Sequence, residues 1–289
     1  MNIRFSAPSK TFLAGEYAVL KGGPALVLAT GPRFTFHAHS GETGVQGIPE
    51  GSPAARWIEK HSTLLKDWKI EFHDPHQGRG GFGASSAQFL FVQALTTLLE
   101  SSVSRVVAGL DVKALLHDYR EFTGGRASGA DLLAQASGQV VRVVNEETAA
   151  LNWPYADLDF AIVRTGQKIS THSHLAELNY EPLESLVGPA TAVVETFGFQ
   201  PAEKFISELR NFSFKLRDLN LQASQDRLEE LERQPWCLVT KGCGALGADT
   251  LLVLFAAQNR DSVVSHFGEN VVATVKDLSP GLEMQWSWT

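Results

Sequence analysis

The chain of 289 residues is poor in cysteine and has no surplus of positive charge. Its two cysteines, Cys237 and Cys243, are too few for a disulfide framework, and their spacing is not that of a zinc-binding pair. Lysine and arginine number 25 against 32 aspartates and glutamates, which gives a formal net charge of −7. This balance excludes the broad basic surface of a nucleic-acid-binding protein. We therefore expect no nucleic-acid partner, and reduced thiols as in a cytoplasmic protein.

Long hydrophobic runs are also missing from the sequence. The late apolar run over 251–257 is far short of the roughly 20 residues that a membrane helix needs. The first residues turn polar before an apolar segment of signal-peptide length develops. We therefore expect no membrane partner and a cytoplasmic location. The hydrophobic content of 44% is ordinary for a globular protein, and the length suggests two domains.

Strand and helix patterns alternate along both halves of the chain, which predicts an α/β or α+β class. Residues 40–54 are rich in glycine and proline and are typical of a loop, and Trp153-Pro154 marks the best domain boundary. We expect strands near 3–5, 25–29, 34–39, 69–73, 139–144, 158–163, 251–255 and 270–276, with a break at Gly31-Pro32. We expect helices near 89–99, 111–122, 129–137, 182–198, 201–233 and 260–267.

A glycine-rich segment, GGFGASSAQ over 80–88, stands immediately before the helical pattern of 89–99. Glycine lets backbone N–H groups approach a ligand closely, and the start of a helix favours a phosphate. The alternative is a flexible turn in which Ser85 caps the helix. The candidate phosphate-binding residues are Gly80, Gly81, Gly83, Ala84, Ser85 and Ser86.

Two charged residues, Lys10 and Asp131, occupy positions where we expect a binding partner. Lys10 is followed by an apolar stretch that encloses Glu16, and buried charges need partners. Asp131 lies in the first turn of the helix expected over 129–137. It is either a carboxylate that complements the helix dipole or a carboxylate directed at a substrate hydroxyl, as phosphoryl transfer requires.

A second glycine-rich segment, KGCGALGAD over 241–249, precedes the strand expected over 251–255, and alone it is typical of a tight turn. Three segments taken in chain order, PSKTFLAGEYAVLKGGPAL, GGFGASSAQ and KGCGALGAD, resemble the three motifs of the GHMP small-molecule kinases. SGADLLAQASG and the Thr165-Gly166 pair with Ser170-Thr171 resemble the mevalonate kinase and phosphomevalonate kinase branch of that family.

The resemblance implies a two-domain α+β fold that binds ATP and Mg²⁺ between its domains. Residues 1–156 would form a ribosomal-protein-like βαβ N-terminal domain, and residues 157–289 a ferredoxin-like C-terminal domain. Lys10 and Asp131 would be catalytic. The metal ligands would be Ser86 and Glu121, the latter after a one-residue shift because Arg120 occupies the position of the family's acidic ligand. The implied substrate and closing-loop residues are Glu16, Tyr17, Ser128, Thr165, Ser170, Thr171, His172, Lys241, Gly244, Ala245 and Gly247.

The function that follows from the resemblance is ATP-dependent phosphoryl transfer to a small hydroxy acid, mevalonate or 5-phosphomevalonate, by a monomer or homodimer. The alternatives are a lyase of the diphosphomevalonate decarboxylase type, and a kinase-fold protein that binds ligand without turnover. Three departures from the family motifs favour keeping the last alternative open: the extra Ala84, Cys243 in place of serine or threonine, and Leu246 in place of glycine.

Histidine pairs are the remaining feature of note. His37 and His39 would share one face of a strand, because strand side chains alternate. No acidic or cysteine cluster stands beside the pair in the sequence, so the pattern predicts no catalytic zinc.

Overall fold

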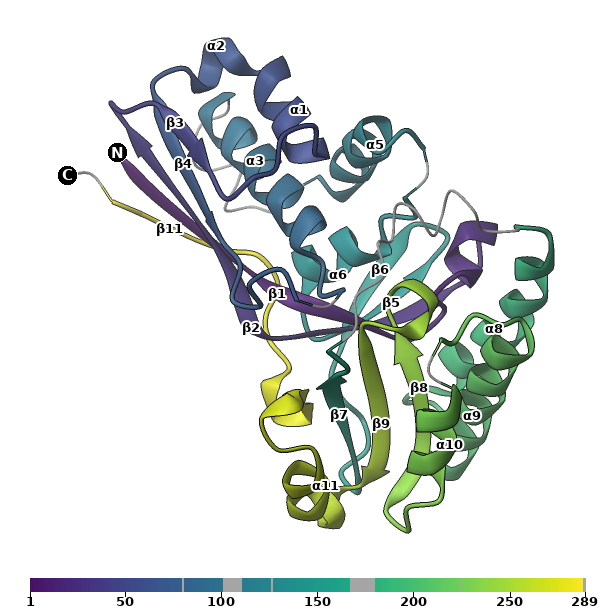
Figure 1. Cartoon of the computed structure of the whole chain (residues 1–289). Helices are drawn as coiled ribbons and strands as arrows, with labels where there is room; N and C mark the ends of the chain where they lie inside the picture. The colour runs from purple at the N-terminus through teal and green to yellow at the C-terminus, as the bar shows by residue number, and fades with distance from the viewer. Residues whose placement is uncertain (80, 101–110, 126, 167–179, 224, 288–289) are drawn as a thin grey trace.

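A computed structural model describes residues 1–79, 81–100, 111–125, 127–166, 180–223 and 225–287 (Figure 1). It confirms the mixed class, since two β-sheets are combined with helices. The first sheet has the strand order β11-β1-β2-β4-β3, and β2 also pairs with β5, which pairs with β6. Its strands are β1 (Asn2–Ala14), β2 (Ala25–Ser40), β3 (Gly44–Gln46), β4 (Trp68–His73), β5 (Val140–Val144), β6 (Glu147–Leu151) and β11 (Glu283–Ser287).

The strand β2 is unbroken, so the break predicted at Gly31-Pro32 is wrong. Proline cannot donate to a sheet ladder, but here the pairing with β1 jumps from Ala7–Phe34 to Ser9–Thr30. The residues between these pairs bulge out, and Ser9 Oγ donates to the Pro32 carbonyl at 2.6 Å. A bulge therefore accommodates the proline without ending the strand.

Helices cover one face of the first sheet (Figure 1). The central one, α3, runs over Ala84–Glu100 and is buried along most of its length, because α1 and α6 flank it. A helix that is apolar on most sides is typical of a core position. The helices of this layer are α1 (Pro53–Lys60), α2 (Ser62–Leu65), α3, α5 (Val112–Phe122) and α6 (Ala130–Ser137), with the short 3₁₀ segment η1 (Ala18–Lys21) after β1.

The second sheet has the order β10-β7-β9-β8, with every pairing antiparallel. Its strands are β7 (Leu158–Arg164), β8 (Cys237–Cys243), β9 (Thr250–Ala256) and β10 (Val271–Thr274). The accompanying helices are α8 (Val187–Thr196), α9 (Ala202–Asp218), α10 (Gln225–Glu232) and α11 (Arg260–Phe267). The 3₁₀ segments of this half are η2 (Glu181–Leu186), η3 (Ala245–Gly247), η4 (Ala257–Asn259), η5 (Gly268–Asn270) and η6 (Val275–Asp277).

Two further sequence predictions need correction. The helix expected over 201–233 is divided into α9 and α10, because Asn220 has a left-handed φ of 55° and Gln222 turns inward to bond Gly242. The loop expected over 40–54 contains the short strand β3, which pairs in parallel with β4. Both differences arise from contacts between segments distant in sequence.

One hydrophobic core runs through both sheets. It includes Phe5 and Phe36 of the first sheet together with Phe160 and Leu254 of the second. The residues of α8 and α9 connect them, since Val193 and Leu209 belong to the same cluster. Within the described segments, no helix has both the length and the apolar character to cross a bilayer.

Candidate active site

The residues before α3 form a tight loop against β1. Gly83 has a φ of +93°, and a Cβ placed there would lie 2.9 Å from Lys10 Cγ and 3.1 Å from Ser86 Oγ. Only glycine fits such a close approach in this backbone conformation. Ser86 is buried and its hydroxyl donates to the Gly83 carbonyl at 3.0 Å. The loop thus presents the first turn of α3, with Ala84 and the exposed Ser85, beside the lysine.

Lys10 lies on β1, and the glycine loop fixes its backbone. Its N–H donates to the Phe82 carbonyl at 3.0 Å, so strand and loop are joined at this residue. The ammonium lies 5.3 Å from the Phe12 ring centroid. Among the described residues it has no hydrogen-bonding partner, which leaves a half-buried cation available to a ligand beside the loop.

The helix α6 directs a polar face toward the same place. Asp131 is half-buried in its first turn, and the backbone N–H of Leu132 donates to its Oδ1 at 3.0 Å. Gln135 follows one turn later, so it shares a helix face with Asp131. Its Nε2 donates to the carbonyls of Pro8 at 3.1 Å and Gly83 at 3.0 Å. The sequence analysis missed Gln135, although its spacing of four from Asp131 was a usable signal.

The second glycine-rich loop meets the first one at Asp249. A Cβ on Gly81 would lie 2.5 Å from Asp249 Oδ2 and 3.4 Å from the Gly244 Cα, and a Cβ on Gly244 would overlap the same carboxylate. The two loops therefore pack backbone against backbone around one buried aspartate. Thr165, directly after β7, is joined to the second loop, since its Oγ1 lies 3.0 Å from the Asp249 carbonyl oxygen and also bonds that of Ala248.

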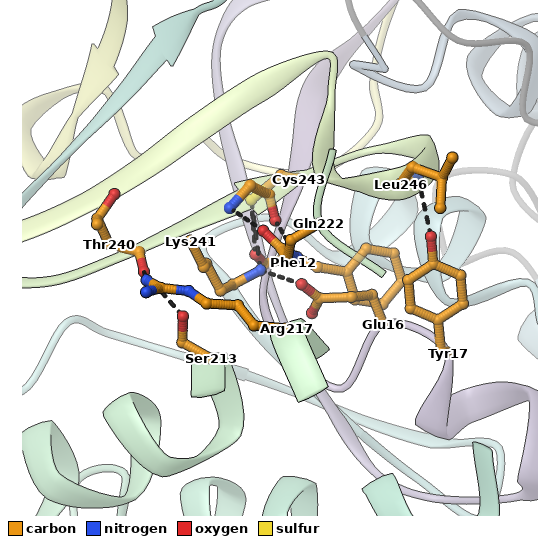
Figure 2. Close-up of polar contacts among 11 residues, drawn as sticks. Phe12, Glu16, Tyr17, Ser213, Arg217, Gln222, Thr240, Lys241, Cys243 and Leu246 are labelled. Carbon is orange, nitrogen blue, oxygen red and sulfur yellow. Dashed lines mark hydrogen bonds and ion pairs between the residues drawn. The ribbon is translucent and has the colours of Figure 1, made fainter. Parts of the chain in front are cut away.

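Glu16 and Lys241 are bonded to each other in the interior (Figure 2). The Lys241 side chain is fully buried, and its ammonium pairs with Glu16 and donates to Cys243 Sγ at 3.3 Å. Burial works to lower the pKa of Lys241, but Cys243 and the Glu16 carboxylate outweigh it and the pKa is raised. In this arrangement the pair ties β8 to the segment that follows β1.

Tyr17 provides a second tie between the same segments (Figure 2). It has a φ of 64°, and its buried hydroxyl accepts a hydrogen bond from the Leu246 backbone N–H at 3.0 Å. Burial raises the pKa of Tyr17, and the bond from Leu246 opposes that rise. Leu246, where the family motif has glycine, has a φ of 50° and so keeps a glycine-like backbone.

A histidine that sequence reasoning did not assign to the site connects the two sheets. His76 is buried and its ring stacks on Phe82 with centroids 4.0 Å apart. Its Nε2 lies 2.6 Å from Ser9 Oγ and its Nδ1 lies 3.3 Å from Arg164 Nη2. Because arginine only donates, Nδ1 accepts and Nε2–H donates to the Ser9 hydroxyl. Burial lowers the pKa of His76 to about 4, against the weaker opposing effect of Asp74, so the ring is neutral.

Several predicted residues lie at the edge of this arrangement or outside it. Glu121 is exposed, and its carboxylate lies 3.8 Å from Lys60 Nζ. Arg120 pairs with Glu146 and donates to the Ser128 carbonyl at 3.1 Å. Ala245 begins η3 and Gly247 ends it, so both lie in the second glycine loop. The predictions for Gly80, Ser170, Thr171 and His172 lie outside the described residues.

A cavity of about 340 Å³ opens near Ser128. It lies between η1, α5, α6 and β5, on the side of α6 that carries Ala130 and Leu133. Its other lining residues are Val19, Gly22, Gly23, Leu116, Arg120, Val143, Asn145 and Glu146. The cavity is thus separate from the place where the two glycine loops meet.

Comparison with known proteins identifies the fold of this chain but no relative by sequence. No protein-family model matches the chain, and no curated protein matches its sequence. Among solved structures, phosphomevalonate kinase of Streptococcus pneumoniae in complex with phosphomevalonate and AMPPNP is 18% identical, with a TM-score of 0.74 over 94% of this chain and 98% of that one. Mevalonate kinase of Methanococcus jannaschii is 14% identical, with a TM-score of 0.68 over 94% and 96%.

Galactokinase of Lactococcus lactis in complex with galactose is 14% identical, with a TM-score of 0.72 over 98% of this chain and 92% of that one. These three enzymes phosphorylate different small molecules, as their names state, and they share the overall fold of this chain. The fold is therefore that of the GHMP small-molecule kinases, as the sequence resemblance predicts.

Proposed function

We propose that this protein is an ATP-dependent kinase that transfers a phosphoryl group to the hydroxyl of a small hydroxy acid of the mevalonate type, mevalonate or 5-phosphomevalonate. One observation carries the proposal: the unpaired Lys10, Gln135 of α6 and the first glycine loop lie together, and the second glycine loop packs on the first. The likeness to a phosphomevalonate kinase structure that contains phosphomevalonate and AMPPNP supports it.

Within this proposal the chain has two domains, 1–156 and 157–289, of the ribosomal-protein-like and ferredoxin-like types, with the nucleotide between them. The glycine loop before α3 belongs to the first and the loop of 244–247 to the second. The strand β11 returns from the second domain to pair with β1. The final strand would therefore bind the domains together.

The residues of this chain contribute mainly by positioning and charge, because phosphoryl transfer needs little covalent help from the protein. Backbone N–H groups at the start of α3 would bind the nucleotide phosphates, a role that helix starts suit well. The Lys10 ammonium would offset negative charge that develops beside the loop. Asp131 would hold or accept the proton of the substrate hydroxyl. Gln135 would hold α6 in place against the glycine loop through its hydrogen bond to Gly83.

The donor set beside the loop fits magnesium. Mg²⁺ prefers oxygen ligands and retains several waters, so it needs only one or two protein groups. The Ser86 hydroxyl and the Asp131 carboxylate are such groups, and Gln135 adds a buried Oε1 that has no partner among the described residues. Bound Mg²⁺ would neutralise charge on the nucleotide phosphates. Glu121 stays a prediction as a further ligand, from its exposed position at the end of α5.

The substrate end of the site rests on fewer described residues. We propose that Thr165 and the residues after it, including Ser170, Thr171 and His172, line the substrate pocket. Arg217 is bonded to Glu232 and to the Thr240 carbonyl. We propose that the cation that distinguishes 5-phosphomevalonate from mevalonate is another residue.

The direct test is an ATP-consumption assay with mevalonate, 5-phosphomevalonate and 5-diphosphomevalonate, with parallel detection of carbon dioxide. The proposal predicts phosphorylation of one of the first two. Carbon dioxide release from 5-diphosphomevalonate would establish the lyase instead. Absence of turnover with all three, together with a thermal shift on adding Mg-ATP, would establish a binding protein, because a ligand of the native state stabilises it.

Substitution of Asp131 by asparagine distinguishes catalysis from helix capping. If Asp131 handles the substrate proton, kcat falls by about 10²- to 10⁴-fold while nucleotide affinity stays close to wild type. If it only complements the helix, stability falls by about 1 kcal/mol and turnover is kept. Steady-state kinetics and thermal unfolding of the one variant measure both quantities. Near-normal kcat would remove Asp131 from the mechanism.

A further inference from the structure

The outward face of the first sheet carries a compact group of histidines and carboxylate. His37, His39 and Glu71 each offer one ligand atom, and these three atoms lie within 4.8 Å of one another. All three side chains are half-buried. The group faces away from the core, because Phe36 and Ala38, which alternate with the histidines on β2, are fully buried. It is therefore separate from the glycine loops and from Lys10.

Strand geometry creates this group from residues that are far apart in sequence. His37 and His39 are two apart on β2, so they point to the same side. On the neighbouring β4, Glu71 pairs directly with His37 in the strand register, which brings the two side chains together. The sequence analysis expected no acidic partner for the histidine pair, and that expectation is wrong, because the partner comes from β4.

The hydrogen bonding of His39 prepares it as a ligand. Its Nδ1 lies 2.7 Å from Asn2 Oδ1, and because an amide oxygen only accepts, Nδ1–H is the donor. The lone pair is then on Nε2, which lies 4.0 Å from Glu71 Oε2. Metal-binding histidines ordinarily donate their second ring nitrogen in this way.

The distance between His39 and Glu71 also suits a metal. A separation of 4.0 Å is too long for a hydrogen bond. Two atoms bound to one tetrahedral zinc ion lie about 3.3–3.6 Å apart, given ligand bonds of about 2.0–2.2 Å. Rotation of side chains alone would close the difference.

We propose that His37, His39 and Glu71 form a binding site for a divalent transition-metal ion, with Zn²⁺ as the ion whose ligand preferences they match. The fourth position goes to water or to His73, whose ring centroid lies 5.4 Å from that of His37. The site links β1, through Asn2, to β2 and β4.

Two neighbouring cations, Lys69 and Arg4, lower the affinity of this site for a metal ion. The Lys69 ammonium lies 3.3 Å from Glu71 Oε1 and 3.7 Å from Glu42 Oε2, so its positive charge competes with a metal ion for the Glu71 carboxylate. Arg4 pairs with His37 across β1 and β2 and adds a like charge next to the metal. Removal of either cation should therefore tighten binding, an outcome that a merely structural histidine cluster would not give.

The test is calorimetric titration of the full-length, untagged chain with ZnCl₂, with Co²⁺ absorption spectra as a report of ligand type. We expect one ion per chain at this site. His39→Ala and Glu71→Gln should each weaken binding by about 100-fold or more, Asn2→Ala by about 10-fold, and Lys69→Met should strengthen it by roughly 5-fold. The matched control is His117→Ala, which removes an exposed histidine of α5 and should leave binding unchanged.

Thermal unfolding without metal confirms that each variant is folded. If zinc binding persists unchanged in the His37→Ala/His39→Ala double variant, or if the wild type binds no zinc, the site does not exist. Equal affinity in Lys69→Met and wild type would also contradict the assignment of Glu71 as a ligand.

Discussion

Two of the links between the first sheet and the second differ in their electrostatics. One link is the buried ion pair of Glu16 and Lys241, and the other is the chain from Ser9 through the neutral ring of His76 to Arg164. Each begins within six residues of Lys10 on the sequence. The comparison shows that a buried ion pair and a hydrogen-bond chain through a neutral imidazole can both connect the two sheets.

The two links differ in what would break them. Removal of one partner of a buried ion pair strongly lowers the unfolding free energy, because the remaining charge has no water to solvate it. A neutral imidazole is instead vulnerable to protonation, which would place a positive ring beside Arg164. Burial lowers the pKa of His76, so acid should act on the second link by protonating this ring.

The largest effect is expected for Lys241→Met. This variant leaves the Glu16 carboxylate buried without its partner, and such a loss costs about 3–5 kcal/mol of unfolding free energy. The measurement is chemical denaturation at neutral pH. The double variant Lys241→Met/Glu16→Leu should recover most of the loss, because it removes both charges. A single variant as stable as the wild type would show that the charges are not the reason this link holds.

The second prediction concerns His76→Leu. The variant loses the stack on Phe82 and leaves the Arg164 Nη2 without its acceptor, a loss of about 1–3 kcal/mol. In the wild type the folded-state pKa of about 4 lies below the ordinary value of 6.5, so the unfolded chain binds this proton more readily. Its stabilising contribution is complete above pH 6.5 and is lost as the pH falls toward 4.

Unfolding midpoints measured across that pH range should therefore fall less steeply in His76→Leu than in the wild type. The exposed His117→Leu variant is the control and should keep the wild-type slope. Identical slopes in wild type and His76→Leu would mean that another group causes the acid sensitivity.

The sequence predicted most of the local elements. The helix after 88, the strand 158–163 and the strand 251–255 all follow from hydrophobic spacing, which is a local property. The catalytic role predicted for Lys10 followed from the family resemblance, whereas its contact with Gly83 was visible only in the structure. Local pattern and motif order were therefore enough for the fold class, while the site residues stay a prediction.

The missed features all depend on register between distant segments. His76 joins the site because the loop after β4 folds back over Ser9, and Glu71 meets His37 because β4 pairs with β2. The burial of Lys241 against Glu16 depends on how β8 packs on β1. The boundary at 156 cannot describe the packing fully, since β11 pairs with β1. No single-sequence pattern contains that information.

The smallest effect on stability is expected for Tyr17→Phe, which removes only the hydroxyl of the residue that follows Glu16. The Leu246 N–H then loses its acceptor, a cost of about 1 kcal/mol. Tyr155→Phe is a matched control, because the Tyr155 hydroxyl accepts from the Gly198 backbone N–H at 3.0 Å, far from the glycine loops in the sequence. Both variants should lose similar stability in thermal unfolding.

Only Tyr17→Phe should also raise the KM for ATP, by a few-fold, because it frees the loop that packs on Gly81. Equal KM values in the two variants would show that the 244–247 loop is positioned by Asp249 alone.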